Sequence, residues 1–190
     1  YNYTTIITPK ENKMADKKIV LKNVEVSWAK LQEAAPKYMS EETEFTLAIR
    51  MTDQMEALMT DYKLNKKVKE GKDSTFDGAR FLQIGLDEKT RNGWQRYGQV
   101  YDKDGNLTKD LIGNGSKMNV FISIGSSQYG NLIKLGHLSD LNQDTKEMTF
   151  DFGQVMDLVD YDQGSAVIRS NETSLSVAKA VDEEVEIAFE

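Results

Sequence analysis

Hydrophobic and polar positions alternate along most of the chain, and a period of two is the pattern of a β-strand with one buried face. The clearest example is residues 111–125, LIGNGSKMNVFISIG. One phase of this segment carries Met118, Val120, Ile122 and Ile124, and the other carries Lys117, Asn119, Phe121 and Ser123. The pattern predicts a half-buried strand whose polar face holds a cation and, unexpectedly, a phenylalanine.

The first strand is expected at residues 19–28, where the hydrophobic phase changes half-way. Ile19 and Leu21 share one phase, whereas Val24, Val26 and Trp28 share the other. A strand that keeps its hydrophobic face through such a change needs one extra residue, so we expect a β-bulge near Lys22 and Asn23.

A loop and a helix are predicted on either side of a second strand. Residues 31–42, which contain Pro36, should form the loop, and the alternating TEFTLAIR at 43–50 should point Phe45, Leu47 and Ile49 inward. A helical stripe follows, formed by Met55, Leu58, Met59 and Tyr62. Asp53 and Glu56 have the spacing of a capping box, Gly71 is the expected stop, and the lysines before it would complement the helix dipole.

From residue 79 onward the pattern is mostly that of short strands separated by turns. Asn92-Gly93 and Asp104-Gly105 are turn signals. Further strands are expected in LIKLGHL, MTFDFGQVMDLVDYD, AVIRS and SLSVAKAV. Short strands at this spacing, with one early helix, predict a small barrel or sandwich.

The composition is that of one soluble globular domain. The chain has 190 residues, 39% hydrophobic and 29% charged. We expect an N-terminal extension at 1–16, a folded domain at 17–178, and an acidic tail or terminal strand at 179–190. The part before Met14 is interpreted either as an upstream extension or as a non-native segment. No stretch has the pattern of a secretory signal or membrane span, and we expect a cytoplasmic protein.

The residue types present restrict the chemistry. The chain has no cysteine and one histidine, His137, so neither thiolate metal sites nor a histidine-rich zinc site are available. His137 is interpreted as structural, and the Asp102–Gly105 segment DKDG as a turn rather than a calcium loop. We therefore expect no enzyme activity, no metal and no cofactor.

Charge is distributed unevenly along the chain. The net charge is −7, but five carboxylates lie in the last nine residues. Without these five, the chain has 24 basic and 26 acidic side chains. Residues 63–96 hold nine Lys or Arg against five Asp or Glu, a net +4. A basic interior segment and an acidic end indicate a polarised molecule.

Residues 89–101, KTRNGWQRYGQVY, interleave cations with aromatic rings and contain no acidic residue. The cations are Lys89, Arg91 and Arg96, and the rings are Trp94, Tyr97 and Tyr101. Single-stranded nucleic acid is bound by this combination, because cations neutralise phosphates and rings stack on unpaired bases. The alternative is a hairpin whose rings pack into the core and whose cations are solvated.

Two further segments have the same double interpretation. Phe121 and Lys117 could form a base-stacking platform, or Phe121 could be covered by the helix or a loop. The tail AVDEEVEIAFE could be an acidic arm for partner binding, or Val185, Ile187 and Phe189 could belong to a last strand. The candidate tail residues are Asp182, Glu183, Glu184, Glu186 and Phe189.

In this order the segments resemble the single-stranded DNA-binding proteins of tailed bacteriophages, which are built on an OB-fold. The matching segments, within residues 17–162, are IVLKNVEVSWAKL, TEFTLAIRMTDQMEALMTDYK, QVYDKDGNLTKDLIGNGSKMNVFISIG and FGQVMDLVDYD. The resemblance implies a mainly β, OB-fold-type barrel with one inserted α-helix and extra strands. It also implies sequence-independent binding of single-stranded DNA in the cytoplasm of the infected host, during phage replication and recombination. Replication proteins such as the DNA polymerase, and a second copy of the chain, are the implied partners.

The candidate DNA contacts follow from the residue patterns together with the family resemblance. They are Trp94, Tyr97, Arg91, Arg96, Lys89, Tyr101, Lys117, Phe121 and Arg80. Two other function classes stay open: a β-rich phage structural or assembly protein that binds no nucleic acid, and a carboxylate-dependent nuclease.

Overall fold

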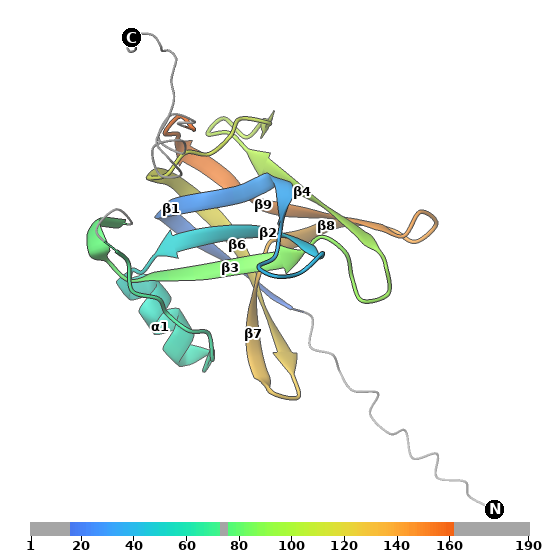
Figure 1. Ribbon diagram of the computed structural model, residues 1–190, viewed down its shortest axis with the longest axis horizontal. Coiled ribbons are helices and arrows are strands. Elements are labelled where there is room, and N and C mark those ends of the chain that lie inside the picture. The colour runs from blue at the N-terminus through green and yellow to red at the C-terminus, as the bar shows by residue number, and fades with distance from the viewer. Residues whose placement is uncertain (1–15, 73–75, 162–190) are drawn as a thin grey trace, which may run out of the picture.

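The computed structural model describes residues 16–72 and 76–161 (Figure 1). Its helices and strands are β1 (Lys17–Pro36), β2 (Thr43–Arg50), α1 (Asp53–Asp61), the 3-10 turn η1 (Phe76–Gly78), β3 (Phe81–Asp87), β4 (Gln95–Tyr101), β5 (Leu107–Thr108), β6 (Ser116–Ser127), β7 (Gly130–Leu135), β8 (His137–Asn142) and β9 (Glu147–Asp157). The strands expected at AVIRS and SLSVAKAV, and the acidic tail, lie outside the described residues.

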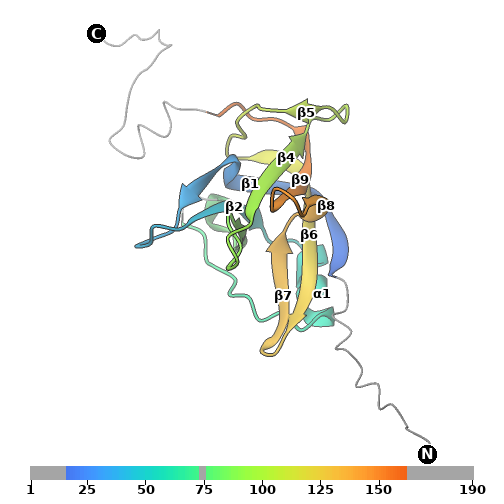
Figure 2. The ribbon, with the colours of Figure 1, turned by 90° about the vertical axis from the view of Figure 1, so that its right-hand side faces the viewer.

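The strands form one curled sheet in the order β3-β2-β1-β6-β9-β4-β5, with β7 added to β6 and β8 to β9 (Figures 1 and 2). β4 runs parallel to β9, and the other strand pairs are antiparallel. The long β1 pairs with β2 and β6 and joins the two halves of the sheet. The prediction of a mainly β, OB-fold-type barrel with one inserted α-helix is confirmed.

The predicted bulge is present in β1. The register with β6 shifts between Leu21 and Val24, and Asn23 has φ 51°. Its backbone N–H donates to Asn119 Oδ1 at 2.9 Å. Asparagine tolerates this left-handed conformation better than most residues, so the bulge forms where the hydrophobic phase changes.

The core is built from the inward phases of the strands, as the alternation predicts. Met118, Val120 and Ile122 of β6 are fully buried, and Ile124 nearly so. Phe45, Leu47 and Ile49 of β2 pack into the same cluster. Each such side chain contributes roughly 1.5–3 kcal/mol through burial. None of the helices in the described part of the chain is long and apolar enough to span a membrane.

The helix is shorter than predicted. α1 ends at Asp61 instead of near Gly71, and its N-cap is Thr52, whose side chain accepts from the Met55 N–H. Lys63 has φ 52° and donates its N–H to Thr60 O, while Leu64 donates to Met59 O. These bonds form a Schellman motif, which closes the helix at this point. The lysines after it are therefore not on a helix and do not complement its dipole.

The predicted loop at 31–42 is also shorter, because β1 continues to Pro36. Ala35 pairs with Glu44 and Pro36 with Thr43 across the β1–β2 ladder. Proline is tolerated at this last position, where the strand needs no further donor. The turns at Asn92-Gly93 and Asp104-Gly105 are present, and Gly93 and Gly105 both have positive φ. Segment LIKLGHL is split at Gly136, also at positive φ, into the end of β7 and the start of β8.

Candidate nucleic-acid interface

The polar phases of β1, β6, β9 and β4 form one continuous outer surface. The ribbons of these strands lie near the centre of Figure 2. The register shows the continuity: Val20 pairs with Phe121, Asn119 with Gln154, and Gln154 with Tyr101. We call this surface the outer aromatic face. Its side chains are Lys18, Val20, Lys117, Asn119, Phe121, His137, Gln154, Tyr97, Gln99 and Tyr101.

Phe121 is half-buried at the centre of this face, and its stacking partner is His137 of β8. The two ring centroids lie 5.0 Å apart with an interplanar angle of 10°. His137 Nε2 lies 3.0 Å from Ile19 O and 2.9 Å from Ile122 O. Because both carbonyl oxygens are acceptors, Nε2 carries the hydrogen and donates it. These bonds hold the imidazole over β1 and β6, so the ring that accompanies Phe121 comes from a strand and not from α1 or a loop.

Cations and one apolar side chain surround this ring pair. Val20 is 38% exposed beside Phe121. Lys18 Nζ donates to Leu138 O at 3.3 Å. Lys117 lies in register between Glu25 of β1 and Asp157 of β9, but forms no ion pair within the described residues. The face therefore offers scattered positive charge around flat rings, and it is not uniformly basic.

Two tyrosines of β4 extend the face, and carboxylates of β9 fix their phenol groups. Tyr101 donates to Asp151 Oδ1 at 2.8 Å, and Tyr97 OH lies 3.4 Å from Glu147 Oε2. The hydrogen bond to Asp151 raises the pKa of Tyr101, and the charge of Glu147 raises the pKa of Tyr97. Both phenols therefore stay neutral, and Tyr97 keeps 48% of its surface exposed.

Arg96 lies on the opposite face of β4 from its neighbour Tyr97. Its guanidinium lies 5.8 Å from the Phe150 ring, and Nη1 donates to Asp87 O at 2.9 Å. Burial lowers the pKa of Arg96, and its Nε is buried with no hydrogen-bond partner in the described part of the chain. The structure thus separates Arg96 from the two tyrosines with which the sequence grouped it.

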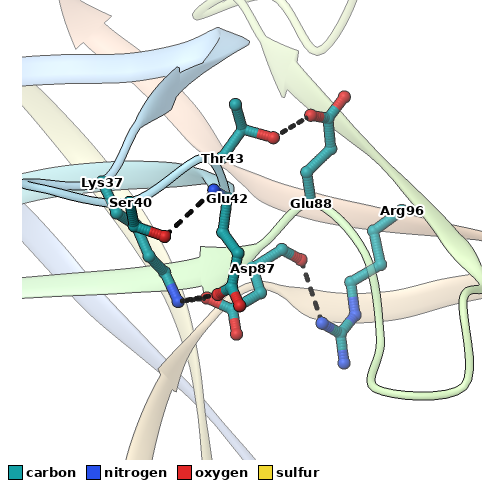
Figure 3. Close-up of polar contacts among 7 residues, drawn as sticks. All are labelled: Lys37, Ser40, Glu42, Thr43, Asp87, Glu88 and Arg96. Atoms are coloured by element: carbon teal, nitrogen blue, oxygen red, sulfur yellow. Dashed lines mark hydrogen bonds and ion pairs between the residues drawn. The ribbon is translucent and has the colours of Figure 1, made fainter.

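The loop between β3 and β4 presents Lys89 and Arg91 to solvent at the rim of the barrel. Both line a cavity of about 610 Å³ with Glu41, Glu42, Thr43, Asp87, Glu88 and Thr90. Figure 3 shows how part of this negative charge is neutralised: Lys37 lies 3.0 Å from Glu42 Oε1 and 2.8 Å from Asp87 Oδ1. The pKa of Lys37 is raised, chiefly by its hydrogen bond to Asp87. Thr43 and Gln95 donate to Glu88, so most of the acid here is already paired.

The remaining sequence candidates lie apart from the outer aromatic face. Trp94 is half-buried in the same loop, where its backbone N–H donates to Thr90 Oγ1 at 2.9 Å. Arg80 lies beside α1 in an ion pair with Glu56. No group of three or more metal-ligating side chains occurs in residues 16–72 and 76–161.

Sequence reasoning missed Lys18, Val20 and His137 on this face, and it misplaced Trp28. The signal for Val20 was present, because it occupies the phase of β1 opposite to Ile19 and Leu21. Trp28 was grouped with the inward Val24 and Val26, but it is 39% exposed. A second bulge, between Ser27 and Lys30, and φ 51° at Trp28 turn the indole outward.

No known protein family matches the chain, and no curated protein sequence does. Among solved structures, gp2.5, a single-stranded DNA-binding protein of bacteriophage T7, is similar with a TM-score of 0.48 and 13% identity, over 92% of this chain and 100% of that one. The single-stranded DNA-binding protein of bacteriophage Enc34, in complex with single-stranded DNA, gives a TM-score of 0.41 and 15% identity, over 76% of this chain and 88% of that one. These values are too low to transfer a function, so the interface is judged by its own residues.

Proposed function

We propose that this chain binds single-stranded DNA without sequence preference, through the outer aromatic face. The observation that carries the proposal is the Phe121–His137 ring pair, half-exposed among Lys18, Val20 and Lys117. The part of this ring pair that stays exposed offers a flat surface, and an unpaired base gains roughly 1–3 kcal/mol by stacking on such a ring.

The distribution of charge favours a single strand over a duplex. Lys18 and Lys117 lie on the sheet beside the rings, and Lys89 and Arg91 lie on the loop at the barrel rim. Phosphates of a flexible strand can reach such separate cations while its bases turn toward the rings. A duplex hides its base faces, so its bases could not stack on these rings. The four cations and the aromatic residues Phe121, Tyr97 and Tyr101 are the proposed contacts.

The biological setting is part of the proposal and comes from the sequence resemblance. The protein would coat and protect single-stranded DNA during phage replication and recombination, in the cytoplasm of the infected host, without catalysis. Its acidic C-terminal residues, Asp182 to Glu186 with Phe189, would contact replication proteins such as the polymerase. Pairing with a second copy is a further proposal of the same origin.

We expect the affinity for single-stranded DNA to fall steeply with salt. If about four phosphates are neutralised, the logarithm of the association constant should fall against log[salt] with a slope of roughly −3. Fluorescence anisotropy of a labelled oligothymidine, titrated at several salt concentrations, measures this slope. A slope near zero would contradict phosphate contacts.

The same protein preparation separates the competing functions. The labelled strand is incubated with protein and magnesium and then analysed on a denaturing gel, with a duplex of equal length as control. The proposal predicts binding of the single strand, weaker binding of the duplex and no cleavage. Cleavage would indicate a nuclease, and no binding of either substrate would favour a structural protein.

A further inference from the structure

A second surface, on the outer phase of β2 and β3, combines an exposed ring with lysines that no sequence candidate included. Trp28 lies at its edge, in the second bulge of β1. The backbone N–H of Trp28 donates to Asn114 Oδ1 at 2.8 Å, and the backbone N–H of Gly115 donates to Val26 O at 2.9 Å. The turn before β6 thus stabilises a positive φ that tryptophan rarely adopts, and such a conformation persists only where its surroundings enforce it.

Packing against Phe81 restricts the motion of the exposed Trp28 indole. Its ring packs edge-on against Phe81, with centroids 5.6 Å apart at 74°, and Phe81 contacts Phe76 at 5.8 Å. Phe76, Phe81 and Ala48 form a small hydrophobic cluster separate from the main core. Much of Trp28 remains open to solvent, so it presents a rigid aromatic surface, which is what base stacking requires.

A groove lined by lysines adjoins this cluster. Lys69 exchanges two backbone hydrogen bonds with Phe81, at 2.8 and 2.9 Å, and its Nζ donates to Gln83 Oε1. Lys66, Lys67 and Lys69 line a groove of about 330 Å³ over β2 and β3, whose only acidic lining residue among those described is Glu44. Gly85 lines this groove without a side chain, and a Cβ atom there would lie 2.9 Å from Phe45 O. None of the three lysines forms an ion pair within the described residues.

We propose that Trp28 and this lysine groove form a second contact for single-stranded DNA, with a base against Trp28 and phosphates along Lys66, Lys67 and Lys69. This inference rests on the proposed function and extends it to a different surface. The ion pair of Arg50 with Glu25 lies between the two surfaces, on β2 and β1. Arg50 Nη1 also lies 3.9 Å from Asp77 Oδ2, so a strand that bridges the two contacts would cross one cation shared by two carboxylates.

The two tryptophans of the chain allow Trp28 to be observed alone. In Trp94→Phe all tryptophan emission comes from Trp28, and in Trp28→Phe all of it comes from Trp94. Titrating Trp94→Phe with oligothymidine should quench the emission in a saturable way, with the midpoint that anisotropy gives for the same variant. Trp28→Ala should weaken binding about 5- to 150-fold, the range for losing one base stack. Circular dichroism confirms that each variant is folded.

The lysines are tested by charge-matched pairs of substitutions. Lys66→Gln/Lys67→Gln removes two groove cations, whereas Lys109→Gln/Lys146→Gln removes two exposed cations elsewhere, so both variants have the same net charge. Each phosphate contact on a single strand contributes about 0.7 to the salt slope, so three groove contacts would steepen the wild-type slope from roughly −3 to roughly −5. The groove variant should lose about 1.4 of this slope and the control close to none. Polyphosphate serves as a competitor without bases.

The outcomes distinguish this inference from the proposed function. Binding of oligothymidine by Trp94→Phe without quenching of Trp28, or equal salt slopes in the two lysine variants, would overturn the second contact and leave the proposed function intact. Equal competition by polyphosphate per phosphate would reveal a general anion groove, which also overturns it. Failure of the wild-type protein to bind oligothymidine would overturn both.

Discussion

Replacing Phe152 by alanine is expected to lower the free energy of unfolding by about 3–5 kcal/mol. Phe152 of β9 is fully buried, and its ring centroid lies 5.1 Å from that of Phe45 on β2. Its edge occupies the space where a Cβ atom on Gly98 of β4 would lie, only 1.9 Å away. The ring therefore fills the space between β2, β4 and β9, and truncation leaves a cavity shared by three strands. Urea unfolding followed by circular dichroism measures the loss.

Further variants on β4 and β9 give this measurement its controls. Met156→Ala lies on the same strand at a position 39% exposed, and it should change stability by about 0.5 kcal/mol or less. Gly98→Ala should itself destabilise the protein, because its new methyl group overlaps Phe152. Combining Gly98→Ala with Phe152→Leu should cost less than the sum of the two single effects, since the smaller side chain makes room. A decrease in the free energy of unfolding below about 1 kcal/mol for Phe152→Ala would show that packing between β2, β4 and β9 does not depend on this ring.

The sequence predicts best those features that depend on the period of two. A shift of register by one residue would place an entire hydrophobic set in solvent, so alternation in β2 and β6 determines both the strand and its buried side. The bulge at Asn23 follows from the same rule, because only an extra residue keeps Leu21 and Val24 on one side. The core and the fold class could therefore be derived without tertiary information.

Features fixed by contacts between distant segments were predicted poorly. The expected stop of α1 is Gly71, but the left-handed Lys63 ends the helix, and the segment after it instead pairs with β3 at Phe81. β1 extends through Pro36 because β2 supplies the ladder partner for Ala35. In both places a pairing across the sheet overrides the local preference that the sequence displays.

The candidate interface shows what residue type alone leaves undecided. Arg96 and Tyr97 are neighbours in a strand, and neighbours in a strand point to opposite faces, so alternation already separates them. Composition had grouped them because both types suit nucleic acid. His137 joins Phe121 only because Gly136 bends the chain between β7 and β8, a tertiary arrangement without a local signal. Lys66, Lys67 and Lys69 can be assigned to a surface groove only once the helix is known to end before them.

Replacing Phe121 by leucine is expected to weaken binding of single-stranded DNA about 5- to 150-fold, equivalent to about 1–3 kcal/mol for one stacked base. Leucine keeps much of the bulk that packs against Val20, but it has no flat face for either a base or the His137 ring. The variant should therefore unfold close to the wild-type midpoint in thermal denaturation while its affinity falls. Anisotropy titration with labelled oligothymidine at fixed salt measures the change, because salt alters the phosphate contribution independently.

The matched control is Tyr129→Ala, which removes a ring that is 85% exposed near the β6–β7 turn, outside the outer aromatic face. Its affinity should equal that of the wild-type protein. His137→Gln adds an internal test, because it removes the second ring of the stack but keeps a side-chain donor near Ile19 O and Ile122 O. If the stacked pair presents the base-binding surface, His137→Gln should lower affinity in the same direction as Phe121→Leu. Wild-type affinity in a folded Phe121→Leu variant, or an equal loss in Tyr129→Ala, would remove this face from the binding site.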